Sequence, residues 1–352
     1  MGRVLFQWSL GVGCFALALE ILFRVLPVST STASGYYVDP VILSYPPHHR
    51  WTMATGWDLR NAQHLESNNY GFVSANDFVR DSQSVALIGD SFVEASMLEP
   101  NDRPGAQLES QLRSRTVFTL GAPGSALLDY AERIRLVHQQ FETENFVILM
   151  ERSDVRQSIC GSGNVHGPCI DAATLQPELQ IKAAPDLAKR LLRNSALAQY
   201  LISQLKLDPA ALVAELAQLT RSVFSSDPGS PRTQGDVRTT PARDTLASSH
   251  AVTQLFFDRV KPYLGKGRLI FVVDCDRSAV YAGNVAVDPE RTRFIQAARA
   301  MGATVIDLEP LFVQHYKSSP LKFDVGPYDG HLNALGVRIA MTAAAKELAQ
   351  SR

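Results

Sequence analysis

Two short motifs near opposite ends of the sequence carry the side chains that acyl transfer through a serine requires. Residues 89–92 read Gly-Asp-Ser-Phe, and residues 328–333 read Tyr-Asp-Gly-His-Leu-Asn. Asp329 and His331 are two positions apart, so in an extended segment both side chains leave on the same side. The carboxylate can then hold the imidazole through Nδ1 while Nε2 takes the proton of Ser91. We therefore predict Ser91 as nucleophile, His331 as its base and Asp329 as the group that orients the base.

Each motif alone also has a purely structural interpretation. Asp90 or Ser91 would make a good N-cap for a following helix, and Asn333 a good N-cap for the last helical pattern, which would leave His331 as an ordinary loop residue. A Gly-Asp-Ser tripeptide occurs by chance in roughly one chain of this length in ten. The position of the serine after an apolar run favours chemistry, because open α/β sheets bind ligands at the carboxyl ends of their parallel strands.

Five short apolar runs, bounded by turn residues, indicate the strands that would position these motifs. Continuous runs of this kind are typical of strands buried on both faces of a parallel sheet. The longer amphipathic stretches between them indicate crossover helices, so we predict an α/β three-layer sandwich. Strands are expected at 85–88, 117–120, 146–150, 269–273 and 304–308, and helices at about 102–114, 126–141, 288–301 and 335–349.

The motifs and the predicted strands occur in the order found in the SGNH/GDSL hydrolase superfamily, which the sequence resembles across roughly residues 80–350. The resemblance implies a flavodoxin-like three-layer sandwich with a five-stranded parallel sheet. It also implies an oxyanion hole that includes the backbone N–H groups of Ser91 and Gly124, since Gly124 follows the second strand as the family's second-block glycine does. The Asp329-Gly330-His331 spacing is similar to that of the subset that includes alginate-type O-acetyltransferases.

The third block departs from the family's pattern. The family has Gly-x-Asn-Asp after the third strand, and its Asn donates the third hydrogen bond to the oxyanion. This sequence has Glu151-Arg152-Ser153-Asp154 there, and the resemblance places Ser153 in the oxyanion hole. A hydroxyl reaches less far than an amide, and losing one oxyanion donor costs about 2.7–4 kcal/mol in a protease. A slow enzyme, a donor role for Arg152, or a descendant without activity are the outcomes left open.

Residues 1–28 predict a membrane anchor. A mostly apolar run follows Arg3, the only charged side chain before it, and resumes past Glu20 and Arg24, which can pair on a helix. A full span needs about 20 apolar residues, and a cation before the span favours export of the chain beyond it. An uncleaved anchor is favoured over a signal peptide cut within 29–34, because the apolar stretch resumes past Arg24. The remaining chain would then lie on the periplasmic or extracellular side.

Residues 29–80 are predicted to form a tether and then an irregular, aromatic extension that packs against a hydrolase-like domain over residues 81–352. Within that domain, residues 155–250 are expected to be an insertion beside the active-site end of the sheet. The insertion shows helical patterns near 183–206 and 208–223. A long loop comes next at 225–244, and its length indicates a mobile surface segment.

Cysteine usage agrees with an exported domain. Cys160 and Cys169 flank a Gly-rich loop that is short enough to close as a disulfide in an oxidising compartment. Free thiols, or a metal site that includes His166, are the alternatives, although three ligands make an incomplete structural zinc site. Cys14 falls in the apolar run, and Cys275 comes after a predicted strand and is expected in the core.

The composition bears on the partners. Lys and Arg number 34 and Asp and Glu 35, which gives a formal net charge of −1. Without a basic run to track a phosphate backbone, no nucleic-acid partner is expected.

The inferred chemistry requires no metal or organic cofactor. We expect a serine esterase acting on an acylated carbohydrate of the cell envelope or an exopolysaccharide. A polysaccharide O-acetyltransferase with the same triad is one alternative. The other is a non-catalytic polysaccharide-binding assembly protein that stacks sugars on Trp51, Trp57 and Tyr70.

Overall fold

The computed structural model describes residues 2–30, 33–163, 167–184, 187–205, 207, 242–326 and 329–350. The chain divides into two compact units. One comprises Met1–Thr32, Trp51–His64 and Ala184–Thr240, and the other Ala33–Arg50, Leu65–Ala183 and Pro241–Arg352. The helical pattern predicted at 208–223, the predicted loop through residue 241, and His166 lie outside the described residues.

A five-stranded parallel sheet forms the centre of the second unit and confirms the predicted fold class. The strands lie in the order β11-β10-β7-β5-β6, and all neighbours are parallel. Numbered along the chain, this is the order 2-1-3-4-5 of flavodoxin-like folds. Their bounds match the apolar runs of the sequence: β5 (Val85–Gly89), β6 (Val117–Gly121), β7 (Asn145–Met150), β10 (Leu269–Val273) and β11 (Thr304–Asp307).

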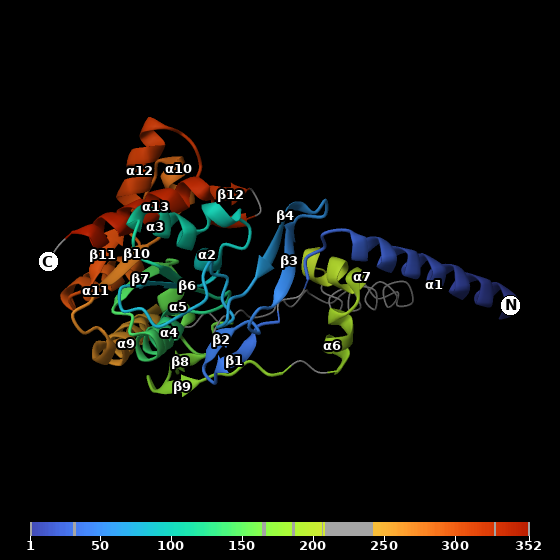
Figure 1. Ribbon diagram of the computed structural model, residues 1–352, viewed down its shortest axis with the longest axis horizontal. Helices are drawn as coiled ribbons and strands as arrows, with labels where there is room; N and C mark the ends of the chain where they lie inside the picture. The colour runs from blue at the N-terminus through green and yellow to red at the C-terminus, as the bar shows by residue number, and fades with distance from the viewer. Residues whose placement is uncertain are drawn as a thin grey trace, which may run out of the picture. The chain divides into compact units, whose positions relative to one another are not determined.

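Helices cover both faces of this sheet and complete the three layers (Figure 1). On one face lie α4 (Leu127–Phe141), α9 (Ala242–Val260) and α11 (Pro289–Ala300), and on the other α3 (Pro104–Leu112), α12 (Leu308–Ser318) and α13 (Ala334–Ala349). The four predicted helices correspond to α3, α4, α11 and α13. Short elements occupy the connections: α2 (Ser91–Glu94), η1 (Pro100–Asp102), α5 (Asp154–Gln157), η3 (Lys261–Tyr263) and α10 (Arg277–Ala282).

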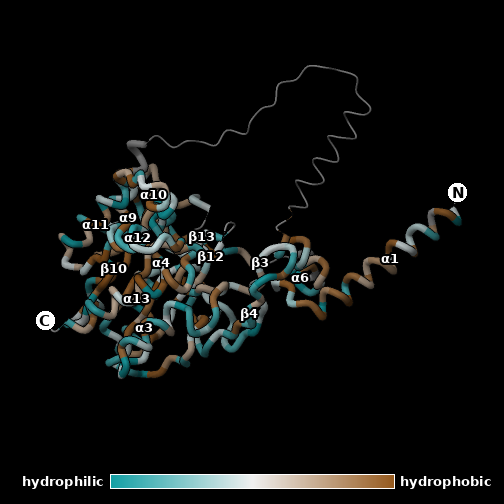
Figure 2. Tube along the Cα trace, turned by 90° about the horizontal axis from the view of Figure 1, so that it is seen from above, coloured by the Kyte–Doolittle hydropathy of each residue, from teal (hydrophilic) through white to brown (hydrophobic). Residues whose placement is uncertain are grey.

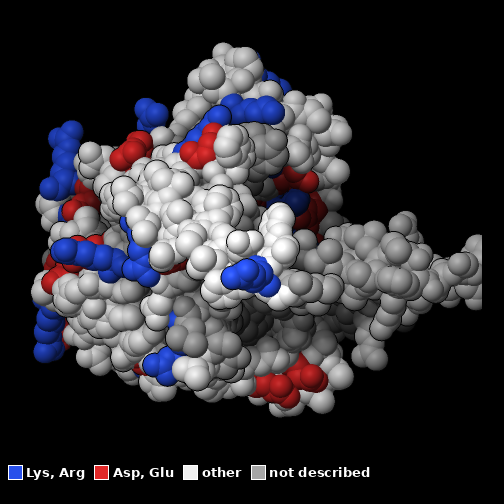
Figure 3. Space-filling view, turned by 90° about the vertical axis from the view of Figure 1, so that its right-hand side faces the viewer, with Lys and Arg blue, Asp and Glu red and all other residues white. Residues whose placement is uncertain are grey.

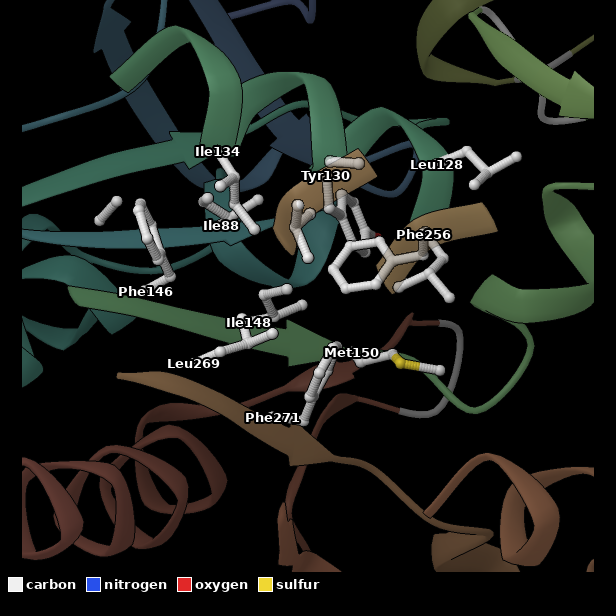
Figure 4. Close-up of a cluster of buried hydrophobic side chains, with 14 of the residues drawn as sticks. Ile88, Leu128, Tyr130, Ile134, Phe146, Ile148, Met150, Phe256, Leu269 and Phe271 are labelled. Carbon is white, nitrogen blue, oxygen red and sulfur yellow. The ribbon is translucent and has the colours of Figure 1, made fainter. Parts of the chain in front are cut away.

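The main core lies between the sheet and the helices α4 and α9, which cover one of its faces (Figure 4). Ile88, Ile148 and Phe271 project from the strands and meet Tyr130 of α4 and Phe256 of α9, and all five are fully buried. Burying a side chain of this size contributes about 1.5–3 kcal/mol relative to leaving it exposed. The packing therefore fixes the strands whose carboxyl ends carry the motifs.

Part of the N-terminal extension belongs to this core. Two short strands, β1 (Gly35–Asp39) and β2 (Ile42–Ser44), pair as an antiparallel hairpin. Phe78 is buried, and its ring centroid lies 4.8 Å from that of Phe118 and 5.7 Å from that of Phe141. These stretches of the extension thus pack as part of the domain.

A disulfide joins Cys160 to Cys169. Cys169 lies on β8 (Pro168–Ile170), which pairs antiparallel with β9 (Pro177–Leu179). The backbone N–H of Cys160 donates to the carbonyl of Ile170 at 2.9 Å. The disulfide and this hydrogen bond therefore tie the segment after α5 to the β8–β9 hairpin.

The first unit contains a long apolar helix, α1 (Gly2–Val25), whose length and composition would allow it to cross a membrane. Figure 2 shows hydrophobic colouring along much of it. The predicted pair forms, with Arg24 Nε 2.8 Å from Glu20 Oε1. Glu20 also accepts from the backbone N–H groups of Ala196 and Leu197, each at 3.0 Å.

The other elements of this unit are short. The helical pattern at 183–206 is interrupted at Ser195, whose side chain caps the second of the resulting helices through the N–H of Ala198. The elements are α6 (Leu187–Arg193), α7 (Ala196–Gln199), the π-helical turn η2 (Tyr200–Gln204), and the hairpin of β3 (Arg50–Thr55) and β4 (Arg60–Glu66), of which residues 51–64 belong here.

Candidate active site

The structure brings Ser91, His331 and Asp329 into one hydrogen-bonded chain. Ser91 is the first residue of α2, directly after β5 and Asp90, while the other two lie on β13 (Asp329–Leu332). The Oγ of Ser91 is 2.8 Å from Nε2 of His331. The Nδ1 of His331 is 2.6 Å from Oδ1 of Asp329. The same carboxylate oxygen accepts the backbone N–H of His331 at 3.0 Å. Nε2 of His331 therefore faces the hydroxyl of Ser91, and Nδ1 faces the carboxylate of Asp329. This is the arrangement that a general base and the group that orients it require.

Asp90 and Asn333 also cap the helices that follow them, as the structural interpretation of the two motifs predicted. The carboxylate of Asp90 accepts the N–H of Phe92 at 2.8 Å and so caps α2. Asn333 caps α13 by accepting the N–H groups of Leu335 and Gly336 at 3.1 and 3.0 Å. Each motif thus caps a helix and also contributes to the hydrogen-bonded chain of Ser91, His331 and Asp329.

Gly89 allows the turn that carries Ser91, because the backbone there is closely packed. A Cβ atom at this position would lie 2.5 Å from Cγ2 of Val93 and 2.6 Å from the carbonyl oxygen of Leu149. Both approaches are closer than real Cβ contacts allow. Below the turn, the buried guanidinium of Arg133 donates to the carbonyls of Gly89 at 2.5 Å and Leu120 at 3.1 Å. The backbone under Ser91 is therefore held from two sides.

The three predicted oxyanion donors, Ser91, Gly124 and Ser153, line the same cavity as His331. Ser91 is the first residue of α2, so its N–H has no acceptor within the helix. Gly124 has a φ of +80°, in the left-handed region that favours glycine. Ser153 differs from these two, because its hydroxyl donates to the carboxylate of Glu151, which also accepts the Ser153 N–H at 2.7 Å. Its hydroxyl must leave Glu151 before it can donate to an oxyanion.

Because the hydroxyl of Ser153 already has an acceptor, we expect Ser153→Ala to lower kcat by much less than the 10²–10³-fold that loss of an oxyanion donor costs. Ser153→Asn places a longer amide at this position and is expected to raise kcat on a simple ester. Steady-state kinetics of both variants would test this. A loss of about 10²-fold in kcat for Ser153→Ala, with KM unchanged, would instead show that the hydroxyl acts in the transition state.

The cavity above the triad has a volume of about 670 Å³ and is lined mainly by polar side chains. Its wall includes one exposed ion pair, in which Arg152 lies 2.8 Å from Asp276. On the face seen in Figure 3, basic side chains are interspersed with acidic ones. Within the described ranges, no group of three or more His, Cys, Asp and Glu side chains is arranged to hold a metal ion.

Burial raises the pKa of several carboxyl groups beneath the nucleophile. The pKa of Asp90 is raised to about 6 and that of Glu94 to about 7, in both cases chiefly by burial. Burial and the nearby carboxylates of Asp90 and Glu151 raise the pKa of Asp154 well above its usual range. Asp154 accepts the hydroxyl of Tyr130 and the N–H of Glu151, each at 2.9 Å.

Glu94 makes folding stability depend on pH. Its pKa rises from 4.5 to about 7 on folding, so the folded state binds its proton more tightly. Its contribution to stability is fully present below pH 4.5 and is lost as the pH rises through about 7.

The glutamine of Glu94→Gln cannot ionise, but it can still accept a hydrogen bond from the hydroxyl of Tyr45, which donates to Glu94 at 2.7 Å. We expect this variant to be more stable than the parent at pH 8, by up to about 3 kcal/mol, with no such gain at pH 4.5. Thermal unfolding at both pH values measures the difference, and an equal difference at the two would contradict it.

Three further cavity residues, Arg277, Tyr281 and Asp324, were not singled out from the sequence. Arg277 donates to Asp324 Oδ1 at 2.7 Å, and the hydroxyl of Tyr281 donates to Asp324 Oδ2 at 2.6 Å. A signal was present, since residues 274–277 read Asp-Cys-Asp-Arg directly after a buried strand. Charged residues at the carboxyl end of a parallel strand are candidates for the ligand site of an open sheet.

No family model and no curated protein matches this chain, whereas several solved structures do. A member of the lipolytic G-D-S-L family from Veillonella parvula is 9% identical, with a TM-score of 0.39 and a match covering 76% of this chain and 99% of that one. An acetylxylan esterase from Geobacillus stearothermophilus, solved as a catalytic mutant, is 12% identical, with a TM-score of 0.39 and coverage of 78% and 99%. A psychrotrophic esterase from Pseudoalteromonas is 10% identical, with a TM-score of 0.34 and coverage of 75% and 97%.

The sheet has the order 2-1-3-4-5. Ser91 follows its first strand and Asp90, and an Asp-x-His segment precedes the last helix and reaches that serine. The chain therefore has a flavodoxin-like sheet, and its serine and its Asp-x-His segment lie in the order expected from the sequence.

Proposed function

We propose that this protein is a serine-dependent hydrolase of ester bonds that works through an acyl-Ser91 intermediate. The observation that carries the proposal is the hydrogen-bonded chain from Ser91 through His331 to Asp329, with Ser91 and His331 lining a cavity of about 670 Å³. A serine hydroxyl with an oriented imidazole beside it is the arrangement that activates this nucleophile.

In the proposed reaction, Nε2 of His331 removes the proton of Ser91 as Oγ attacks the ester carbonyl, and then returns it to the leaving alcohol. Asp329 holds the tautomer that keeps Nε2 unprotonated and stabilises the imidazolium that forms. The backbone N–H groups of Ser91 and Gly124 stabilise the oxyanion, with Ser153 as a third donor when its hydroxyl leaves Glu151. Water, activated by the same imidazole, then cleaves the acyl-enzyme.

The substrate class we propose is an acyl ester on a carbohydrate of the cell envelope or an exopolysaccharide. Carboxylates, hydroxyls and the guanidinium groups of Arg152 and Arg277 line most of the cavity wall, together with the less polar side chains of Phe92, Cys275 and Tyr281. Such a wall suits a hydroxylated alcohol and a short acyl group better than a long alkyl chain.

Labelling with a fluorophosphonate tests the proposal directly. Intact-protein mass spectrometry should show one added phosphonyl group, and peptide mapping should place it on Ser91. Cleavage of p-nitrophenyl acetate should accompany the labelling. Transfer of the acetyl group to an added oligosaccharide would assign the chain as an O-acetyltransferase with the same triad. Absence of both labelling and turnover would overturn the proposal and favour a polysaccharide-binding role.

We further propose that α1 anchors the protein in a membrane and that the domain with the sheet lies on the periplasmic or extracellular side. The apolar length of α1, and Arg3 in its first turn ahead of the apolar run, support this orientation. Alkaline phosphatase fused after residue 60 should therefore be active in a bacterial host, because that enzyme needs an oxidising compartment. An inactive fusion, together with an active cytoplasmic reporter at the same point, would reverse the topology.

A further inference from the structure

Arg277 connects three parts of the cavity wall. It is the first residue of α10, and its side chain is only 9% exposed although it lines the cavity. Its guanidinium donates to the carboxylates of Asp274 and Asp324 and to the backbone carbonyl of Gly330. It also lies 5.5 Å from the ring centroid of Phe92, the residue after the nucleophile.

The contact with Gly330 acts on the segment that carries the base. Gly330 stands between Asp329 and His331, on β13, which pairs only with β12 (Asp324–Gly326) among the described strands and is not part of the five-stranded sheet. The sheet therefore does not hold this segment through a hydrogen-bond ladder. Leu332 anchors its far end in the core, but Gly330 has no side chain to bury. The hydrogen bond from Arg277 to its backbone carbonyl attaches it to α10 instead.

The partner strand is fixed by the same guanidinium. Asp324 accepts from Arg277 through one oxygen and from the hydroxyl of Tyr281 through the other. The hydroxyl of Tyr281 in turn accepts the N–H of Phe323 at 2.9 Å. Phe323 is fully buried. Both strands of the β12–β13 hairpin are thus attached to α10, which follows β10 of the five-stranded sheet.

We propose that Arg277 is a positioning residue, which holds the Asp329–His331 segment at hydrogen-bonding distance from Ser91. The inference rests on the proposed function, since it concerns the geometry of that triad. Arginine suits the task because its planar guanidinium presents five donors in a fixed fork, whereas lysine presents a single compact charge. A displacement of about 1 Å in a reacting group can cost about 10²-fold in rate.

The test compares Arg277→Gln with Arg291→Gln in the full-length protein. Arg291 is the matched control, because it is a buried arginine near the same end of β10 that pairs with Asp307 and donates to the carbonyl of Asp274 at 2.7 Å. Within the described part of the chain, its hydrogen bonds reach neither β12 nor β13.

The rates are measured well below the melting temperatures of both variants. Arg277→Gln should lower kcat and the rate of fluorophosphonate labelling by about 10²-fold, with little change in KM. Arg291→Gln should lose stability while labelling at close to the parent rate. Arg277→Lys should fall between the parent and Arg277→Gln.

The outcomes separate this inference from the proposed function. A parent protein that the probe does not label overturns the proposed function, whatever the variants do. If the parent is labelled and Arg277→Gln reacts at the same rate, Arg277 does not position the base. If Arg277→Gln does not fold, Arg277→Lys and Tyr281→Phe decide, since each keeps part of the attachment. Both should then show a lower kcat at an unchanged KM, and full activity in both would overturn the inference.

Discussion

Replacing Ser91 with alanine is expected to lower kcat by about 10⁶-fold, because removal of the nucleophile of a serine triad has an effect of this size. The hydroxyl removed is the one that lies 2.8 Å from Nε2 of His331. Folding should be little affected, since Asp90 rather than Ser91 caps α2. Turnover of p-nitrophenyl acetate and fluorophosphonate labelling measure the loss, and circular dichroism checks the fold.

Ser110→Ala is a suitable control, because Ser110 lies on an exposed face of α3 and its hydroxyl donates to the carbonyl of Gln107 on the same helix. It should keep the parent rate. If Ser91→Ala retained esterase activity within an order of magnitude of the parent, or were still labelled, another nucleophile would carry the reaction. The role assigned to Ser91 would then be wrong.

Asp329→Asn should produce the second largest effect, a loss of about 10⁴-fold in kcat. An amide at this position can present its NH₂ group to Nδ1 and so favour the tautomer in which Nε2 carries the proton. That tautomer cannot accept the proton of Ser91. The hydrogen bond at stake is the 2.6 Å contact between Asp329 Oδ1 and His331 Nδ1. Steady-state kinetics on an activated ester give the measurement.

A double variant separates this role from a general loss of folding. Residues that act as one catalytic unit are not additive, so Asp329→Asn combined with His331→Ala should be no slower than His331→Ala alone. Multiplying losses would show that Asp329 and His331 act independently. In that case the hydrogen bond between them would not be part of the mechanism.

The central sheet could be predicted because its strands are buried on both faces. Val85–Gly89 and Leu269–Val273 are apolar at nearly every position, and all their residues are buried. The hairpins of the N-terminal extension gave no such signal. The strand Gly35–Asp39 is half-buried at most positions, so its alternation is weak. Helix α12 was missed because it begins at Leu308, which was predicted as the end of a strand.

The triad could be predicted because each half of it is local. Asp329 and His331 are two residues apart, and Ser91 comes shortly after an apolar run. The hydrogen-bond partners of the surrounding side chains could not be predicted, because they depend on which rotamer each residue adopts in the fold. Ser153 bonds Glu151, two positions away, and Arg277 bonds a carbonyl 53 positions away. Nothing in composition or spacing distinguishes those partners from others.

The separation of the two halves also has a consequence in time. Ser91 and His331 are 240 positions apart along the chain. A ribosome that adds about 5–20 residues per second makes the base roughly 12–48 s after the nucleophile. Any product that stops before residue 331 therefore carries a serine without its base. On the proposed mechanism, ester cleavage begins only when almost the whole domain has been made and its last hairpin has docked.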